Sequence, residues 1–254
     1  MQEDTETEDI KNSLKSIWIV TREFAHIAEA GGVKNVSCSL AVNLQKKGID
    51  VTVFIPLYKC TDLSRIENFS KLDISCSIKS NGKDYQVGFS QGFFEGVRII
   101  FIENQIFSEK NAVYVYTEEE AKLNPTFECG IGHKDSFQMN VIFQQAVLYY
   151  GFLTNNEPKI VHCQDAATAL VSVFARNLFP FVRFYATTKF IVTIHNAGPG
   201  YLHTFPTMEI AKNITNLPEN ILKRGVPYYN CQVVEPFLLA AKYSYITTVS
   251  PWYA

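Results

Sequence analysis

The sequence predicts an α/β protein with a doubly wound, mostly parallel sheet. Short and continuous apolar runs alternate along the chain with segments of helical periodicity. Strands that are buried on both faces have unbroken apolar sequences, and the helices between them cover the two faces of a parallel sheet. A glycine pair, Gly31-Gly32, stands between the first apolar run and an amphipathic helix, an arrangement that fits the turn from a strand into a helix.

Composition excludes several classes of protein. The chain has 254 residues, of which 47% are hydrophobic and 19% charged, and its formal net charge is −2. A chain of this length buries a sizeable core as one large domain or two small ones. The charge balance gives no basic field for nucleic acid, and no apolar run approaches the roughly 20 residues that span a bilayer. We therefore expect neither nucleic acid nor membrane as a partner.

The N-terminal segment and the cysteines complete the expected organisation of the chain. Residues 1–15 are rich in Asp and Glu, unlike a signal peptide, and are predicted to be a disordered lead-in to a domain spanning 16–254. Six cysteines occur without a C-x-x-C pair, so they indicate neither a zinc site nor a redox motif. Buried free thiols in a reducing compartment are the simplest interpretation, and it predicts a cytoplasmic protein.

The first half of the chain supplies five predicted strands and two helices. The helix over 33–47 has a stripe of Val36, Leu40 and Leu44, and Gly48 ends it. Asn81-Gly82 is a hairpin signal between two strands. The predicted strands are 17–20, 51–56, 72–80, 84–91 and 97–103, and a long helix follows over 135–153.

The second half continues the alternation. The predicted strands are 160–163, 190–194 and 245–249, with helices over 165–176 and 235–243. Two stretches, 104–134 and 197–232, lack clear periodicity and are rich in Pro, Gly, Asn and Tyr. Long loops that follow strands in such a sheet lie over the carboxyl ends of the strands, where ligands bind.

Three strand ends carry polar groups that are expected to meet at this edge. The first strand leads to Gly31-Gly32, the second to Asp165, and the third to His195-Asn196. Helical N–H groups behind a glycine turn attract phosphate, so a carboxylate, an imidazole and amides beside them indicate a sugar or nucleotide site. The loop opens with Glu29, an acid that conflicts with an anion site.

Each of these residues also has a structural interpretation. The glycine pair alone is a common turn and is not the G-x-G-x-x-G fingerprint. Asp165 is also a candidate N-cap of the helix that follows it. His162 is interpreted as a structural residue bonded within the sheet, and a structural role remains open for His195. His26, His133 and His203 lack acidic or cysteine partners at metal spacing, so no metal is predicted.

Four segments, in order, resemble the N-terminal catalytic domain of bacterial glycogen synthases and plant starch synthases. The family's Lys-x-Gly-Gly-Leu-x-Asp-Val loop corresponds to 29–36, and its His-x-His-Asp-Trp-x-x-x-Leu segment to 162–170. Its Thr-x-His-Asn motif corresponds to 193–196, and its Ile-Thr-Thr-Val-Ser-Pro-x-Tyr-Ala segment to 246–254. The resemblance extends from about residue 16 to the last residue.

The resemblance implies a GT-B glycosyltransferase, in which two Rossmann-like domains face each other across a cleft. The implied reaction is retaining transfer of glucose from ADP-glucose or UDP-glucose to the non-reducing end of an α-1,4-glucan, without a metal or other cofactor. His195 would orient the donor glucose with Asn196 beside it, and Asp165 would support the sugar side. Gly31-Gly32 would meet the diphosphate. Tyr114 or Tyr116 would supply an aromatic contact near the sugar.

The chain departs from the family pattern at the expected cleft. Glu29 replaces the family's lysine, so an anion stands where a cation would meet the diphosphate. Two unit charges about 4 Å apart interact by roughly 1 kcal/mol in water and about 4 kcal/mol at an effective dielectric constant near 20. Lys34 is near in sequence but is one turn into the helix. Further departures are Asn35, Gln164 and Ala166.

Three hypotheses follow from these motifs and departures. The first is the acceptor-side half of a glycogen or starch synthase-like transferase, incomplete without the C-terminal GT-B domain, for which we expect the chain to be part of a longer protein. The second is a degenerate, non-catalytic glucan-binding or regulatory domain. The third is a GT-B transferase whose different donor avoids residue 29.

Overall fold

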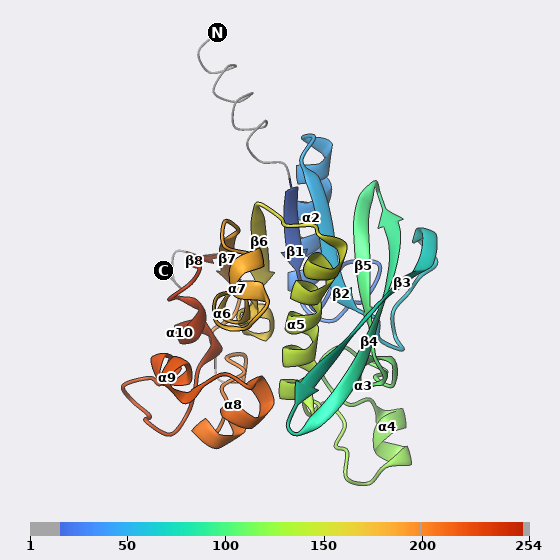
Figure 1. The fold of residues 1–254 in the computed structure, drawn as a ribbon. Helices are drawn as coiled ribbons and strands as arrows, with labels where there is room; N and C mark the ends of the chain where they lie inside the picture. Colours follow the sequence, from blue (N-terminus) through green and yellow to red (C-terminus); the bar gives the residue numbers. More distant parts are fainter. Residues whose placement is uncertain (1–15, 199, 251–254) are drawn as a thin grey trace.

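The computed structural model, described here for residues 16–198 and 200–250, contains an eight-stranded sheet in the order β3-β4-β5-β2-β1-β6-β7-β8 (Figure 1). β4 is antiparallel to both β3 and β5, and the other neighbours are parallel. The predicted doubly wound, mostly parallel sheet is confirmed. The acidic segment 1–15 and residues 251–254 lie outside the described residues. The strands are β1 (Ser16–Val20), β2 (Asp50–Pro56), β3 (Glu67–Ser80), β4 (Lys83–Phe94), β5 (Val97–Glu103), β6 (Ile160–Gln164), β7 (Lys189–Ile194) and β8 (Tyr245–Thr248).

Helices cover the sheet, and short helices occupy the connections. None of those described is long and apolar enough to cross a membrane. The α-helices are α2 (Val33–Lys46), α3 (Gln105–Ser108), α4 (Glu118–Leu123), α5 (Ser136–Thr154), α6 (Val171–Asn177), α7 (Phe181–Phe184), α8 (Met208–Thr215), α9 (Glu219–Leu222) and α10 (Pro236–Ala240). Two 3₁₀ turns are η1 (Ala166–Thr168) and η2 (Lys223–Gly225).

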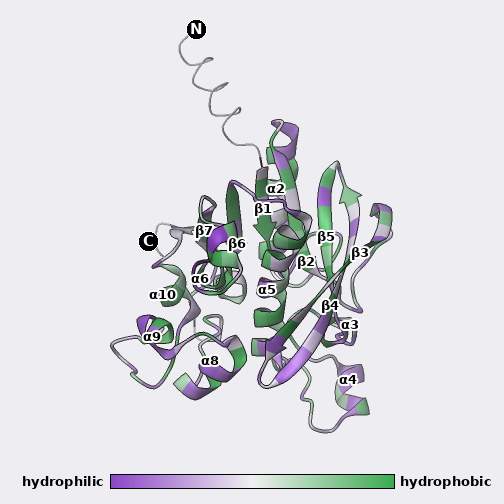
Figure 2. Ribbon diagram, in the orientation of Figure 1, coloured by the Kyte–Doolittle hydropathy of each residue, from purple (hydrophilic) through white to green (hydrophobic). Residues whose placement is uncertain are grey.

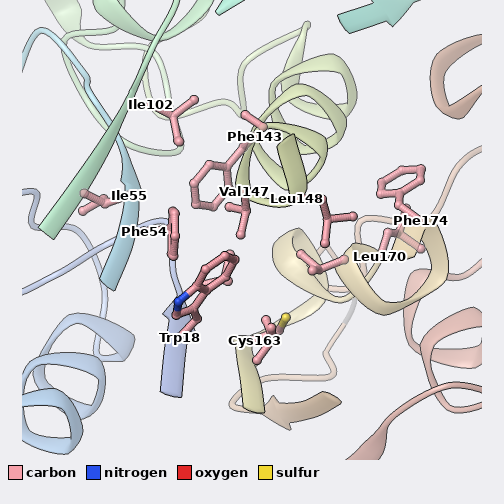
Figure 3. Close-up of a cluster of buried hydrophobic side chains, with 14 of the residues drawn as sticks. Trp18, Phe54, Ile55, Ile102, Phe143, Val147, Leu148, Cys163, Leu170 and Phe174 are labelled. Carbon is pink, nitrogen blue, oxygen red and sulfur yellow. The ribbon is translucent and has the colours of Figure 1, made fainter. Parts of the chain in front are cut away.

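Hydrophobic residues gather on the central strands of the sheet (Figure 2), and a cluster of buried side chains lies between these strands and α5 (Figure 3). Trp18 on β1 is 1% exposed and packs against Phe54 of β2, with 4.7 Å between the ring centroids. Leu148 of α5 and Cys163 of β6 close the same cluster (Figure 3). Burial of this kind contributes roughly 25 cal/mol per Å² of apolar surface, which anchors β1 and β6 and therefore the loops that leave them.

The predicted hairpin at Asn81-Gly82 is confirmed. Asn81 and Gly82 have φ angles of 49° and 73°, the left-handed pair that a tight two-residue turn requires. β3 and β4 extend beyond the predicted limits, and β3 has register irregularities between Glu67 and Ser70 and between Leu72 and Ser75. The tip docks on α8, where Asn213 O accepts a hydrogen bond from Asn81 N at 2.7 Å.

The predicted apolar stripe of α2 is only partly correct. Val36 is 43% exposed, whereas Ser37, Ala41 and Val42 are the buried residues of this helix. Leu40 and Leu44 pack partly against the core. The face of α2 that packs against the sheet therefore carries small residues. The reason is that the first turns of the helix approach the residue after β1 closely: Ser37 Oγ lies 3.2 Å from Thr21 Oγ1.

The predicted helix over 165–176 is also corrected. Asp165 has a φ of 64° and ψ of 176°, which no helix permits, and a 3₁₀ turn separates it from α6. The two irregular stretches contain α3, α4, α8 and α9, which the sequence analysis missed. A capping box between Thr117 and Glu120 starts α4, and Thr207 caps α8, so local signals for two of them were present.

The interpretation of the cysteines as buried free thiols is correct for some of the six. Cys76 and Cys163 are buried, but Cys60, Cys129 and Cys231 are exposed, because the last three lie in connecting loops rather than on strands. All six thiols are free.

Candidate functional site

Three neighbouring strands bring the predicted residues to one edge of the sheet. β1, β6 and β7 are parallel neighbours, so their carboxyl ends meet at the same edge. The glycine loop follows β1, Asp165 follows β6, and His195 follows β7. We call residues 21–32, 164–165 and 195–196 the strand-end site.

Asp165 ties β6 to the loop after β7. Its Oδ1 accepts hydrogen bonds from the backbone N–H groups of His195, at 2.9 Å, and Asn196, at 3.3 Å. It makes no helix-capping bond, so the N-cap interpretation is wrong. Burial raises the pKa of the carboxyl, while the two N–H donors oppose the rise.

The backbone of Asp165 is strained. The combination of φ 64° and ψ 176° belongs to a region that is essentially limited to glycine and costs a side-chain-bearing residue on the order of 1–3 kcal/mol. Such strain persists where surrounding contacts impose it, and it clusters at functional sites. The sequence carries no signal for it.

His195 is held by Gln164, one of the departures from the family pattern. Its Nε2 lies 2.7 Å from Oε1 of Gln164, a side chain that is 2% exposed. Burial lowers the pKa of His195, so the imidazole is neutral near pH 7. Gln164 therefore fixes the ring orientation of a neutral histidine.

The glycine loop already holds an anion from its own chain. Glu23 Oε2 accepts hydrogen bonds from Ala30 N, at 3.1 Å, and from Gly31 N. Glu23 is 1% exposed, and burial raises the pKa of its carboxyl against the effect of these bonds and one from Val33 N. The carboxylate thus fills part of the positive N-terminus of α2 that a ligand anion was expected to occupy.

The two glycines face different surroundings. A Cβ on Gly31 would lie 3.1 Å from Glu23 Oε1, so this glycine makes room for the internal carboxylate. A Cβ on Gly32 would meet nothing within 4 Å. The side of the loop at Gly32 is therefore the open one.

Glu29 does not stand as an isolated negative charge. Its Oε2 lies 2.7 Å from Lys34 Nζ, and its Oε1 accepts a hydrogen bond from His26 N at 2.8 Å. The bond from Lys34, followed by that from His26, lowers the pKa of Glu29. The negative charge of Glu29 is therefore paired with Lys34 from the first turn of α2.

A buried arginine behind the site was not found from the sequence. Arg22 is 3% exposed and donates to Tyr58 Oη, Asn140 Oδ1 and Val113 O at 3.0, 2.7 and 2.6 Å. Its guanidinium lies 5.2 Å from the centre of the Tyr114 ring. The pKa of Tyr114 is raised well above its usual value, first by burial and then by Glu23. Tyr114 therefore lies in the electrostatic neighbourhood of the strand-end site.

Other predicted residues are structural. Tyr116 stacks on Phe127 at 4.0 Å and is 3% exposed, and its hydroxyl accepts a bond from Lys134 N. His162 Nε2 lies 2.6 Å from Thr193 Oγ1 on the neighbouring strand, as expected for a residue bonded within the sheet. No group of three or more His, Cys, Asp or Glu side chains in the described part of the chain is arranged to hold a metal ion.

Comparisons with known proteins agree on the family. Glycogen synthase 2 of Geobacter sulfurreducens is 27% identical over 93% of this chain and 46% of its own length. Probable starch synthase 4 of Arabidopsis thaliana is 27% identical over 92% of this chain and 21% of its own length. The present chain spans about half the length of the bacterial relatives that it matches.

A solved structure gives the same result. The catalytic domain of starch synthase IV from Arabidopsis thaliana, bound to ADP and acarbose, superposes with a TM-score of 0.79 at 27% identity, over 94% of this chain and 45% of that one. The fold is thus the Rossmann-like part of a GT-B glycosyltransferase. The family described as the starch synthase catalytic domain matches residues 16–254, and the chain belongs to that family.

Proposed function

We propose that this chain is the acceptor-side half of a glycogen or starch synthase that transfers glucose from ADP-glucose or UDP-glucose to an α-1,4-glucan. A second GT-B domain, outside these 254 residues, completes the enzyme. The observation that carries the proposal is the strained Asp165, held by the N–H groups of His195 and Asn196 at the strand ends of a starch synthase-type domain.

The free atoms of this cluster suit a sugar. Within the described residues, Oδ2 of Asp165 and the side-chain nitrogen Nδ2 of Asn196 have no hydrogen-bond partner, whereas Asn196 Oδ1 accepts from Gly198 N at 2.9 Å. A carboxylate acceptor, an amide donor and the neutral ring of His195 together match the hydroxyls of the donor glucose. Because the bond to the diphosphate breaks with positive charge on the sugar, fixed polar groups that orient the ring lower the barrier.

The diphosphate meets the loop at Gly32 in this proposal. The N–H groups of Ala30 and Gly31 are already bonded to Glu23, so they stabilise the loop instead of the leaving group. The open side at Gly32 admits a phosphate oxygen, and the compensated charge of Glu29 lessens the repulsion. Cations for the rest of the diphosphate come from the second domain.

The transfer is tested with the complete gene product that contains this chain. Incorporation of labelled glucose from ADP-glucose or UDP-glucose into glycogen is measured for wild type, His195→Ala and His162→Gln. We expect His195→Ala to lower turnover at least about 100-fold, the usual cost of removing a group that orients the reacting centre. His162→Gln is the control, because His162 lies on β6, the strand next to the one that leads to His195. This variant is expected to retain most activity. Unchanged turnover in His195→Ala would contradict the assignment of His195 to the donor-glucose site.

A second candidate is a non-catalytic glucan-binding domain. The internal carboxylate of Glu23 on the loop amides favours it, because a filled anion site binds phosphate poorly. Calorimetry of the same gene product separates the two. Binding of maltohexaose without binding of either nucleotide sugar supports the second candidate, and nucleotide-sugar binding supports the transferase.

A further inference from the structure

Three polar side chains connect the segment after β1 with the segment after β7. Arg22 Nη1 donates to Asn140 Oδ1 at 2.7 Å, and Nδ2 of Asn140 lies 3.3 Å from Nδ1 of His203. Arg22 and Asn140 are 3% and 5% exposed, and His203 is partly buried. Asn140 lies near the start of α5, so this helix joins two segments that leave the sheet at different strands. We call the three residues the buried relay.

The donors and acceptors of the buried relay determine where its hydrogens lie. A guanidinium group only donates, so the side-chain oxygen of Asn140 must face Arg22 and its Nδ2 must face His203. An amide NH₂ group only donates as well, so Nδ1 of His203 must carry a lone pair. The relay therefore requires a neutral His203 whose hydrogen is on Nε2.

The surroundings of His203 oppose its protonation. Burial, and then the charge of Arg22, lower the pKa of His203 from an ordinary 6.5 to about 4. Tyr58 and Tyr114 flank the Arg22 guanidinium, which lies 5.8 and 5.2 Å from their ring centres. Burial raises the pKa of both tyrosine hydroxyls, so they stay neutral. A proton on His203 would thus place a second positive charge near Arg22.

Residues 201–205, the segment that carries His203, are also held through Phe205. Its ring stacks on Phe137 of α5, with 4.9 Å between the ring centroids. Its backbone N–H donates to Val234 O at 2.9 Å, and its carbonyl accepts from Val234 N at 3.0 Å. Phe137 and Val234 are uncharged. Among these contacts of the segment, only the bond between Asn140 and His203 depends on a side chain that titrates.

The backbone of His203 adds to the dependence on this bond. Its φ is 48°, in the left-handed region that is uncommon for residues with a side chain. A conformation of this kind persists where surrounding contacts impose it. The bond from Asn140 is such a contact, so losing it favours departure of the segment from α5.

We propose that His203 is a proton-sensitive latch, which fastens residues 201–205 to α5 as a neutral acceptor and releases them when it is protonated. A protonated Nδ1 would direct its hydrogen at the Asn140 NH₂ group, while Arg22 still holds the amide oxygen. Because the segment follows His195 and Asn196, its release loosens the strand-end site. The consequence for glucose transfer rests on the proposed function, whereas the latch itself is tested without any transfer assay.

The test uses NMR on the 254-residue chain with ¹⁵N-labelled histidine, and the His203 signals are assigned by their loss in His203→Asn. At pH 7 we expect Nδ1 of His203 to carry no hydrogen, and its titration midpoint to lie well below 6.5. Release is measured as the hydrogen-exchange protection factor of the Phe205 backbone N–H. It should fall about 20-fold between pH 7 and 5, because a released histidine has a pKa near 6.5 and the latched one a pKa of about 4.

Two variants make the test specific. Asparagine at position 203 tolerates a positive φ, offers Oδ1 in place of Nδ1 and does not titrate. His203→Asn should therefore keep the same protection of Phe205 at pH 5 as at pH 7. In Asn140→Asp the new carboxylate accepts from a protonated Nδ1, so the midpoint of His203 should rise and the segment should stay latched at pH 5.

Three results would overturn the proposal. A hydrogen on Nδ1 of wild-type His203 at pH 7 would contradict the buried relay, and so would a midpoint that Asn140→Asp leaves unchanged. An equal fall in protection in wild type and His203→Asn would assign the release to other groups, such as the carboxyls whose pKa values burial raises, Glu23, Asp165 and Glu235. The wild-type hydrogen position is decisive even if a variant does not fold, and none of these results depends on transferase activity.

Discussion

At the scale of single residues, Gly31 and Gly32 stand side by side but have different roles. Gly31 gives space to the carboxylate of Glu23, whereas Gly32 borders open space. The sequence shows the pair and predicts a turn, but it does not show which neighbour each glycine faces. That difference depends on Glu23, eight residues earlier, turning back onto the loop.

A pair of alanine variants tests this difference. A Cβ at Gly31 would lie 3.1 Å from Glu23 Oε1, so Gly31→Ala requires the carboxylate to shift slightly against the N–H groups that hold it. We expect a loss of about 1 kcal/mol in the free energy of unfolding, measured by urea denaturation. Gly32→Ala meets no atom and should stay within about 0.5 kcal/mol of wild type. Equal losses in the two variants would contradict the assigned role of Gly31.

At the scale of elements, α5 lies against β1 at a contact that only glycine permits. A Cβ on Gly151 would lie 2.5 Å from Cη2 of Trp18 and 2.8 Å from Asn156 O, and closer still to the hydroxyl of Tyr185. That hydroxyl donates to Leu148 O at 2.6 Å. The long helix was predicted from its pattern, but this close approach to the sheet was not.

Gly151→Ala should therefore destabilise the protein although alanine favours helices. Overpacking of this kind costs typically 1–3 kcal/mol, and we expect a loss of at least about 1 kcal/mol by chemical denaturation. Leu153→Ala, on the exposed side of the same turn, is the control and should cost less. A Gly151→Ala protein as stable as wild type would show that α5 can move away from Trp18 without penalty.

At the scale of the whole molecule, partly buried, neutral histidines link stability to pH. Burial lowers the pKa values of His162 and His203 from an ordinary 6.5 to about 4. Above about pH 6.5 neither the folded nor the unfolded state binds the protons. Between pH 6.5 and 4 only the unfolded state binds them, so the free energy of unfolding falls as the pH falls through this window.

Each histidine contributes up to about 3 kcal/mol to this fall, since one pKa unit corresponds to about 1.4 kcal/mol. Replacing His162 by Gln removes one titrating group, so the slope of the free energy of unfolding against pH should become shallower between pH 6.5 and 4. His26→Gln, at an exposed position in the loop after β1, is the matched control. Parallel pH profiles for wild type and His162→Gln would contradict the neutral state of His162.

The sequence by itself determined the eight strands, the long helices α2 and α5, the hairpin at Asn81-Gly82 and the grouping of Asp165 and His195, because periodicity, turn residues and strand ends are local properties. Tertiary structure decided the rest. Asp165 leaves the helix because amides 30 residues later bind its carboxylate, and Val36 faces outward because small residues fit against β1. The loop amides take Glu23, and Lys34 neutralises Glu29, because the chain folds these side chains back onto the loop. Contacts between distant residues, or between side chains that only a turn brings together, leave no periodic pattern in the sequence from which they could be predicted.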